Sequence, residues 1–355
     1  MPSTRLKGLL FALACLVGFA GTIRATAAQE LSPDDCKNTS TSESLVVNGV
    51  VRTYVLYVPC RFRAHESALL VAMHGRFGTG AGFEASSQLD EKANREGFVV
   101  VYPDALIDAV GSANWNYYYD PFFVNAPDDV GFIRALIDLL RATLRPDPRR
   151  IYVTGTSAGG FMAQTLGVAL SDRVAAIGVV EGGISVITPT SPQSVPNAAA
   201  PVSVLMLKGD QDPSNFYCGA VFTQFGVVES SADQDFSYWT GPAANRCSHV
   251  DTTTPFCSSV GTVGADGTTF GQPTPLVEKE ARSCKDDVEV KVYRLIGGVD
   301  QWNLAPMNVP GQVPYNPDLN AHTGVTTNDI LWKFFARHPK SRAPETAVSL
   351  RPSTG

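Results

Sequence analysis

The stretch from Arg150 to Leu166 reads RIYVTGTSAGGFMAQTL and decides the fold. Its first part, Ile151 to Val153, is a β-branched and aromatic run typical of a buried strand, and apolar residues recur at helical spacing from Phe161 onward. Between them, small residues flank Ser157 and leave room for a sharp turn. This order of strand, tight turn and helix predicts a nucleophile elbow with Ser157 held in a strained, accessible conformation.

The composition is that of a globular protein. The 355 residues are 44% hydrophobic and 17% charged, which excludes a disordered or fibrous chain. Residues 1–27 combine basic residues, an apolar run too short to span a bilayer and a small-residue Ala25-Thr26-Ala27 site, and therefore predict a secretory signal peptide. Its cleavage changes the formal net charge from −6 to −9, because it removes three positive charges and no negative ones. We therefore expect a secreted protein that binds neither nucleic acid nor, after cleavage, a membrane.

The cysteine count agrees with export. Six cysteines follow the predicted signal peptide, namely Cys36, Cys60, Cys218, Cys247, Cys257 and Cys284. An even number suits disulfides in an oxidising compartment. Cys36 and Cys60 come nearly opposite each other across a hairpin predicted at Asn48-Gly49, one residue from ideal register. No cysteines or histidines have zinc spacing, so we predict no metal and no cofactor.

Strand-like runs alternate with helical patterns along the chain. After the hairpin, strands are expected at 68–73, 98–102, 151–153, 175–180, 202–207 and 288–296, and helices at 85–95, 130–144, 161–170 and 326–337. This alternation predicts a single α/β domain over residues 28–338, with a mostly parallel sheet, helices on both faces and the hairpin at one edge. Residues 213–287 break the rhythm and predict a cysteine-rich elaboration. Residues 339–355 are expected to be a disordered tail.

A serine nucleophile needs an acid, a base and an oxyanion hole. The strand at 202–207 runs into Asp210 and Asp212, and Asp212 is preferred as the acid. The predicted oxyanion donors are the backbone N–H groups of Ala158, directly after the serine, and of Arg76, after the strand at 68–73. In this order of elements the base is a histidine that follows the acid along the chain.

Several segments resemble the secreted polyhydroxybutyrate depolymerase and feruloyl esterase group of α/β-hydrolases. They read VAMHGRFGTGAGF, VVVYPDAL, DDVGFIRALI, DPRRIYVTGTSAGGFMA, KGDQDP and ILWKFFARHP. The resemblance implies an α/β-hydrolase fold and a serine carboxylic ester hydrolase that forms an acyl-enzyme on an ester substrate, including polyesters and plant cell-wall esters. It also implies Asp212 as the acid, at the last position of the group's H-G-x-x-D motif. A disulfide between Cys247 and Cys284 follows in the same way, which leaves Cys218 and Cys257 for a further pair.

The chain departs from this group at the base. The group's last strand leads into G-G-x-H-x-W-P-G, whereas this chain reads Gly297-Gly298-Val299-Asp300-Gln301-Trp302-Asn303. Asp300 therefore stands in place of the histidine, and Lys208 replaces the histidine of the acid motif. An ordinary aspartate, with a pKa of about 3.9, is a weak base for a serine hydroxyl. A second carboxylate near Asp212 also disfavours two negative charges.

The missing histidine leaves three hypotheses. In the first, a histidine from elsewhere is the base, and His322 is the leading candidate because it lies between the last strand and the closing helix. In the second, Asp300 itself is a base with a raised pKa. In the third, the chain is a pseudoenzyme that binds a polymer or carbohydrate in the same cleft. The retained serine, acid and oxyanion donors favour the active esterase, with Trp302 and Trp115 predicted to line its substrate site.

Overall fold

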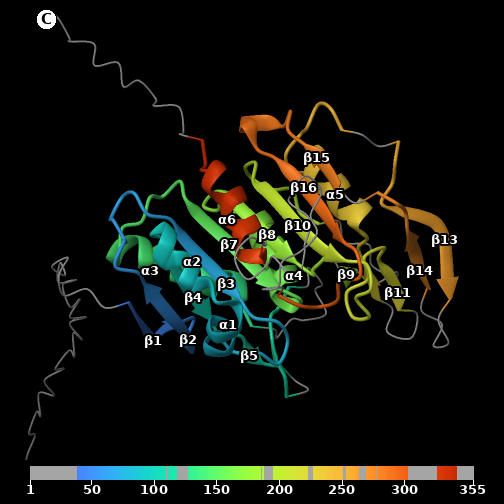
Figure 1. Cartoon of the computed structure of the whole chain (residues 1–355). Helices are drawn as coiled ribbons and strands as arrows, with labels where there is room; N and C mark the ends of the chain where they lie inside the picture. Colours follow the sequence, from blue (N-terminus) through green and yellow to red (C-terminus); the bar gives the residue numbers. More distant parts are fainter. Residues whose placement is uncertain are drawn as a thin grey trace, which may run out of the picture. The chain divides into compact units, whose positions relative to one another are not determined.

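A nine-stranded sheet forms the centre of the computed structural model (Figure 1). The structure describes residues 38–108, 111–117, 127–184, 186–187, 195–222, 227–250, 253–263, 269–276, 278–302 and 326–341. All of these lie within the compact unit Ser32–Gly355. The predicted signal peptide and most of the predicted tail lie outside the described residues. In the described ranges, no helix combines the length and apolar character needed to cross a bilayer.

The main sheet is parallel in its middle and antiparallel at both edges. In spatial order its strands are β1 (Thr39–Val47), β2 (Val50–Val58), β4 (Val99–Pro103), β3 (Leu69–Met73), β7 (Ile151–Thr156), β8 (Ala176–Val180), β10 (Ser203–Gly209), β16 (Val290–Leu295) and β15 (Glu278–Ala281). The strands from β4 to β16 pair in parallel, whereas β1, β2 and β15 pair antiparallel with their neighbours. The parallel strands therefore bring their carboxyl ends to one edge, where loops meet.

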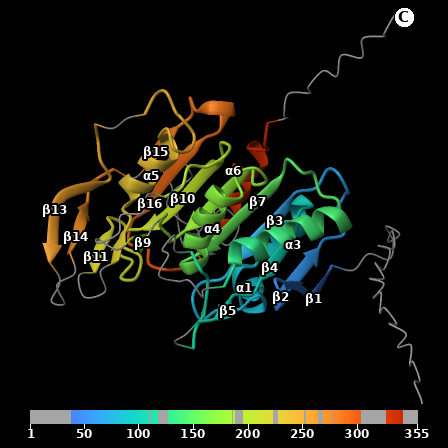
Figure 2. The ribbon, with the colours of Figure 1, turned by 180° about the vertical axis from the view of Figure 1, so that it is seen from behind.

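Helices cover both faces of this sheet, as Figures 1 and 2 show from opposite sides. One face packs against α3 (Asp129–Thr143), α4 (Ala158–Ala169) and α5 (Ala232–Thr240), and the other against α1 (Gly80–Ser87), α2 (Leu89–Glu96) and α6 (Thr327–Arg337). Successive side chains of a strand point to opposite faces of the sheet, so Tyr152 of β7 belongs to one apolar cluster and Val153 to the other. The predicted α/β architecture is confirmed.

The prediction of one helix at 85–95 is wrong in one respect, because the end of α1 and most of α2 occupy this stretch. Gln88 has a left-handed φ of 53° and separates α1 from α2. A left-handed residue cannot continue a right-handed helix, so the chain changes direction there. Sequence periodicity does not detect such a break, since apolar residues continue on both sides of it.

The cysteine-rich region adds a second sheet. Its strands, in spatial order, are β13 (Cys257–Val263), β14 (Thr269–Pro273), β11 (Ala220–Phe222), β12 (Val227–Glu229) and β9 (Val186–Ile187), all antiparallel. Disulfides join Cys218 to Cys257 and Cys247 to Cys284, which confirms both predicted pairs. The third predicted disulfide joins Cys36 to Cys60, and Cys36 lies outside the described residues.

A short β5 (Leu106–Ile107) and β6 (Ala113–Asn114) pair antiparallel beyond the end of β4. A short 3₁₀ helix at Lys285–Asp287 precedes β16.

Candidate active site

Ser157 lies in the sharp turn between β7 and α4. Its backbone adopts φ 53° and ψ −124°, a conformation that a residue with a side chain rarely occupies. Two hydrogen bonds fix the turn: the Ser157 N–H donates to the Val180 carbonyl at 3.0 Å, and the Phe161 N–H donates to the Ser157 carbonyl at 3.0 Å. The strained serine is therefore anchored both to β8 and to the first turn of α4.

The glycines around Ser157 are required by close backbone contacts. A Cβ atom on Gly155 would lie 2.4 Å from the Gly159 carbonyl oxygen, and one on Gly159 would lie 2.3 Å from the Met73 carbonyl oxygen. A Cβ on Gly160 would lie 2.7 Å from the Val180 carbonyl oxygen. Real side chains do not approach backbone atoms this closely, so the turn can pack between β3 and β8 only with glycine at these positions.

The two predicted oxyanion donors flank the serine. A Cβ on Gly75 would lie 3.3 Å from the Ser157 Cβ, so the backbone leading into Arg76 runs directly beside the serine. In the part of the chain that the structure describes, neither the Arg76 N–H nor the Ala158 N–H donates a hydrogen bond. The Arg76 guanidinium pairs with Asp108 at 3.0 Å. Both N–H groups are thus positioned beside Ser157 without an acceptor among the described residues.

His74 supports this turn and both of its ring nitrogens are engaged. Nδ1 contacts the Gly75 carbonyl at 2.6 Å, and Nε2 accepts from the Ala105 N–H at 3.1 Å. Burial lowers the pKa of His74. The neutral ring therefore has a structural role in this arrangement.

Trp115 does not occupy the predicted substrate-contact position. It is only 1% exposed, its Nε1 donates to the His74 carbonyl at 2.8 Å, and its ring lies 5.0 Å from the His74 ring. The indole is therefore almost fully buried against the turn that leads to Arg76, which differs from the predicted substrate contact.

Asp300 contacts Ser157 directly. The Ser157 hydroxyl donates to Asp300 Oδ2 at 2.9 Å. Burial, the largest influence, raises the pKa of Asp300; the hydrogen bond from Ser157 lowers it, and the charge of Asp212 raises it. The net direction is upward. A carboxyl group therefore occupies the place expected for a catalytic base, and its basicity is greater than that of an ordinary aspartate.

The loop that carries Asp300 is packed onto the loop after β10. The Gln211 N–H donates to the Gly298 carbonyl at 2.9 Å, and a Cβ on Gly298 would lie 2.9 Å from the Gly209 Cα. Asp210 clamps the same loop, because its carboxylate accepts from Arg294 Nε and from the Gly297 N–H, each at 2.7 Å. Asp210 thus positions the chain that leads to Asp300.

Asp212 has different partners. Its Oδ1 accepts from the N–H groups of Ser214 at 2.7 Å and Asn215 at 2.9 Å, and its Oδ2 accepts from Asn215 Nδ2 at 3.2 Å. A hydrogen bond from the Asn215 side chain also lowers the pKa of Asp300. The Asn215 amide therefore interacts with both carboxylates. Sequence reasoning missed Asn215, although its position three residues after Asp212 is typical of an aspartate-nucleated turn.

Glu181 is a further carboxyl group that sequence reasoning missed. It directly follows β8 and is fully buried. Its Oε2 accepts from the Gly209 N–H at 2.7 Å, and its Oε1 has no hydrogen-bond partner in the described part of the chain. Burial raises the pKa of Glu181 well above its ordinary value, and the charges of Asp212 and Asp300 act in the same direction. Among the described residues, no group of three or more histidine, cysteine, aspartate or glutamate side chains is arranged to hold a metal ion.

Lys208, which stands in place of the motif histidine, is also fully buried. Its Nζ pairs with Asp235 Oδ2 at 3.1 Å, and neither side chain is exposed to solvent. The Ile184 N–H donates to Asp235 Oδ1 at 3.0 Å. The pair therefore ties β10 to α5 behind the acid loop.

The remaining predicted site residues lie toward the C-terminus. The half-buried Trp302 donates from Nε1 to Asn328 Oδ1 at 2.9 Å and meets the Phe83 ring edge to face at 5.1 Å. Its contact with substrate stays a prediction. His322 lies outside the described residues, so its role as the base stays a prediction as well.

Comparison with known sequences identifies a family segment. Residues 52–198 match the family described as esterase PHB depolymerase. The chain is 31% identical over 180 residues to feruloyl esterase B of Piromyces equi and 31% identical over 127 residues to poly(3-hydroxyalkanoate) depolymerase C of Paucimonas lemoignei. These alignments cover 48% and 36% of this chain but only 31% and 30% of the two relatives. The chain thus spans less than a third of the length of either relative.

Comparison with solved structures supports the fold. An acetyl xylan esterase from Aspergillus awamori superposes with a TM-score of 0.50 over 83% of this chain and 99% of that chain, at 15% identity. At this identity the likeness concerns the fold alone. The resemblance to polyhydroxybutyrate depolymerases and feruloyl esterases is therefore confirmed: residues 52–198 carry the esterase PHB depolymerase family segment, on an α/β-hydrolase fold.

Proposed function

We propose that the protein is a secreted carboxylic ester hydrolase in which Ser157 is the nucleophile and Asp300 accepts its proton. The observation that carries this proposal is the 2.9 Å hydrogen bond from the Ser157 hydroxyl to Asp300 Oδ2, at a serine held in the elbow conformation. A general base must lie within hydrogen-bonding distance of the proton that it removes, and Asp300 meets this requirement. The family segment supports an ester as the substrate.

The proposed reaction proceeds through an acyl-enzyme. As Ser157 Oγ attacks the ester carbonyl, its proton passes to Asp300, and the N–H groups of Ala158 and Arg76 stabilise the oxyanion. Protonated Asp300 then gives the proton to the departing alkoxide, and the acyl group stays on Ser157. Water attacks the acyl-enzyme as Asp300 takes one of its protons, and the acid product leaves as Ser157 regains a proton from Asp300.

The surroundings of Asp300 favour this role. Burial makes the carboxylate a stronger base, because a low-dielectric environment disfavours its charge and raises its pKa. Asp212 adds a negative charge nearby, and Asn215 donates a hydrogen bond to Asp212. Asp212 thus acts on Asp300 through charge and through Asn215, in place of the usual contact with an imidazole.

Exposed apolar residues near the site favour a water-insoluble polymeric ester. Phe77, Ile107 and Ile296 are 75%, 66% and 74% exposed, and each follows a strand at the carboxyl edge of the sheet. Phe77 and Ile107 are neighbours through Ala113, whose carbonyl accepts from the Phe77 N–H and which pairs with Ile107. Contact with an apolar polymer surface would remove these side chains from water. A polyester is therefore the preferred substrate class.

Hydrolysis of a short-chain aryl ester by the purified protein tests the proposal. Ser157→Ala and Asp300→Asn are expected to abolish measurable turnover, whereas His322→Ala keeps it, because an amide at position 300 cannot accept a proton. Loss of turnover in His322→Ala with retention in Asp300→Asn would instead assign the base to His322. A folded parent protein without any hydrolysis would overturn the proposal and favour a pseudoenzyme that binds polymer.

A further inference from the structure

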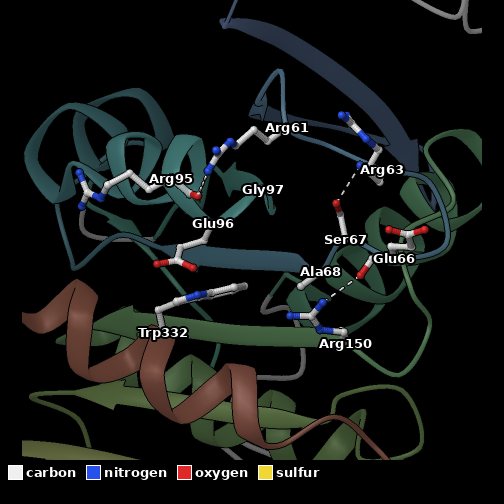
Figure 3. A pocket seen from close by; sticks show the side chains of 10 residues that line it. All are labelled: Arg61, Arg63, Glu66, Ser67, Ala68, Arg95, Glu96, Gly97, Arg150 and Trp332. Carbon is white, nitrogen blue, oxygen red and sulfur yellow. Dashed lines mark hydrogen bonds between the residues drawn. The ribbon is translucent and has the colours of Figure 1, made fainter. Parts of the chain in front are cut away.

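A cavity of about 330 Å³ lies at the amino-terminal edge of the parallel strands, away from the candidate active site (Figure 3). Its lining comes from the connections that lead into β3, β4 and β7 and from α6, and includes Arg61, Arg63, Arg95, Glu96, Arg150 and Trp332. Arg150 directly precedes β7 and Ser157 directly follows it. A strand of this length separates its two ends by about 20 Å, so the cavity and the serine are distinct places on the molecule.

Three of the four arginines of the cavity donate to backbone carbonyls rather than to carboxylates. Arg61 Nη1 donates to the Arg95 carbonyl at 2.6 Å, Arg63 Nη1 to the Phe62 carbonyl at 2.8 Å and Arg150 Nη1 to the Glu66 carbonyl at 2.9 Å. A guanidinium has five N–H donors, so most of the donors on each side chain are still available. Neutral carbonyls also leave the positive charge uncompensated.

None of these four arginines forms an ion pair with any residue in the described ranges, whereas Arg52, Arg76 and Arg294 elsewhere in the chain each do. Two glutamates border the same cavity. Glu96 pairs with Lys92 at 3.1 Å, and Glu66, whose backbone carbonyl accepts from Arg150, forms no ion pair within the described ranges. The lining thus holds four arginines against two glutamates, and this local excess of positive charge contrasts with the formal net charge of −6 of the whole chain.

Trp332 gives the cavity a rigid apolar wall. It is 7% exposed and stacks on Phe98, with ring centroids 4.1 Å apart. The Arg150 guanidinium lies 5.9 Å from the centre of the Trp332 ring, and Figure 3 shows Arg61 on the opposite side of the cavity from Arg150. An apolar wall lowers the local dielectric, so charge interactions in the cavity are stronger than on an open surface.

We propose that this cavity binds a tetrahedral oxyanion, a phosphate or sulfate group, between Arg61 and Arg150. Planar guanidinium groups present paired N–H donors that match the oxygens of such an anion and bind it more specifically than a lysine does. The cavity is large enough for an organic group attached to the anion. This site does not depend on the proposed ester hydrolysis.

Isothermal titration calorimetry at low ionic strength tests the site, with inorganic phosphate, inorganic sulfate and glucose 6-phosphate as probes and chloride as the ionic-strength control. Phosphate and sulfate are expected to bind with one-to-one stoichiometry, and chloride is not. Arg61→Gln and Arg150→Gln are each expected to weaken binding at least tenfold, because each removes one charge but keeps an amide donor. The matched control is Arg246→Gln, which removes an exposed arginine that also donates only to a backbone carbonyl, that of Pro242. It should change affinity less than twofold.

Circular dichroism and thermal unfolding establish that each variant is folded, and the exposed Arg61 carries the test if Arg150→Gln does not fold. Tighter binding of glucose 6-phosphate than of phosphate would support the site and assign a phosphate monoester as its ligand; equal affinities would support a site for the free anion. Absence of binding by the folded parent would overturn the proposal, and so would an equal loss of affinity in Arg246→Gln.

Discussion

Two sides of the candidate site are built by different means. The elbow side, residues 74–76 and 155–160, is held mainly by backbone contacts that admit only glycine and by hydrogen bonds between main-chain groups, with the His74 ring as a side-chain support. The carboxylate side, residues 181, 209–215 and 297–300, is held by side chains, with Asp210, Asp212 and Asp300 each receiving hydrogen bonds. The elbow side includes one histidine, His74, and burial lowers the pKa of that ring and favours its neutral form. The geometry of the carboxylate side depends on how many of its acids are ionised.

The two sides should therefore respond differently to substitution: the elbow side to the volume of a new side chain, and the carboxylate side to its charge. On the elbow side an added methyl group collides with backbone atoms that cannot move away, so small changes in volume matter and charge does not. On the carboxylate side the loops are joined by polar contacts, so changes in charge matter more than volume. The predictions below test the two sides against each other.

The largest effect is expected for Asp300→His. The imidazole would stand beside Ser157 and near Asp212, and general acid–base catalysis by a positioned histidine contributes about 10²- to 10⁴-fold. Turnover of a short-chain aryl ester should therefore rise on the order of a hundredfold, measured as kcat. Gln301→His, which adds an imidazole one residue away at an exposed position, is the control and should leave kcat unchanged. Adding Asp212→Asn should remove the gain, and a gain that survives it would contradict the roles given to the carboxylate side.

Gly159→Ala is expected to have the largest effect on stability. Its Cβ would lie 2.3 Å from the Met73 carbonyl oxygen, and overpacking of this kind costs about 3 kcal/mol of unfolding free energy. Urea denaturation measures the change. Gly82→Ala in α1 is the control, since the nearest atom to its Cβ is Thr79 Oγ1 at 3.1 Å; it should change the unfolding free energy by less than about 1 kcal/mol. Similar losses in the two variants would show that the elbow side is not specially constrained.

Asp210→Ala tests the contacts by which Asp210 holds Arg294 and the Gly297 N–H on the carboxylate side. Arg294 is 15% exposed and would lose its carboxylate partner, which costs about 2 kcal/mol for a partly buried pair. We expect lower stability and lower kcat together, because the Gly297 turn that leads to Asp300 would be released. The comparison variant, Asp138→Ala, breaks exposed contacts with Arg141 and Arg173 and should cost less than about 1 kcal/mol. Wild-type kcat in Asp210→Ala would mean that the Asp210 contacts do not position Asp300.

Asp300→Asn should produce a small rise in Tm at neutral pH. The folded-state pKa of Asp300 is raised, so the folded protein holds a carboxylate that is more favourable in the unfolded chain. The stability that protonated Asp300 contributes is fully present below the unfolded pKa of about 3.9 and is lost as pH rises through the folded pKa. The Tm difference between variant and parent should therefore shrink as the pH is lowered toward 4. A difference that does not change with pH would argue against a raised pKa.

Local sequence patterns predicted much of the molecule. The hairpin turns at Asn48-Gly49 with Val47 opposite Val50, and the elbow lies between a strand and a helix at Ser157. Both features depend on a few neighbouring residues, which is why periodicity and glycine placement reveal them.

Other features of the site depend on contacts between distant segments. The raised pKa of Glu181 depends on its burial and on the charges of Asp212 and Asp300, which come from distant parts of the sequence. The buried Trp115 donates its indole N–H to the backbone carbonyl of His74, also far away in the sequence. Neither relation is encoded in spacing along the chain. The position of Asp300 against Ser157 likewise required the packing of one loop on another, so sequence alone left three hypotheses for the base.

The buried pair of Lys208 and Asp235 bears on the evolutionary history of the site. The proposed Asp300→His variant changes position 300 alone. Position 208 cannot do the same: a neutral side chain there would leave Asp235 as a buried, unpaired carboxylate, at a cost of about 3–5 kcal/mol. Restoring the motif histidine at position 208 would therefore require a change at Asp235 as well, which makes Lys208 harder to replace than Asp300.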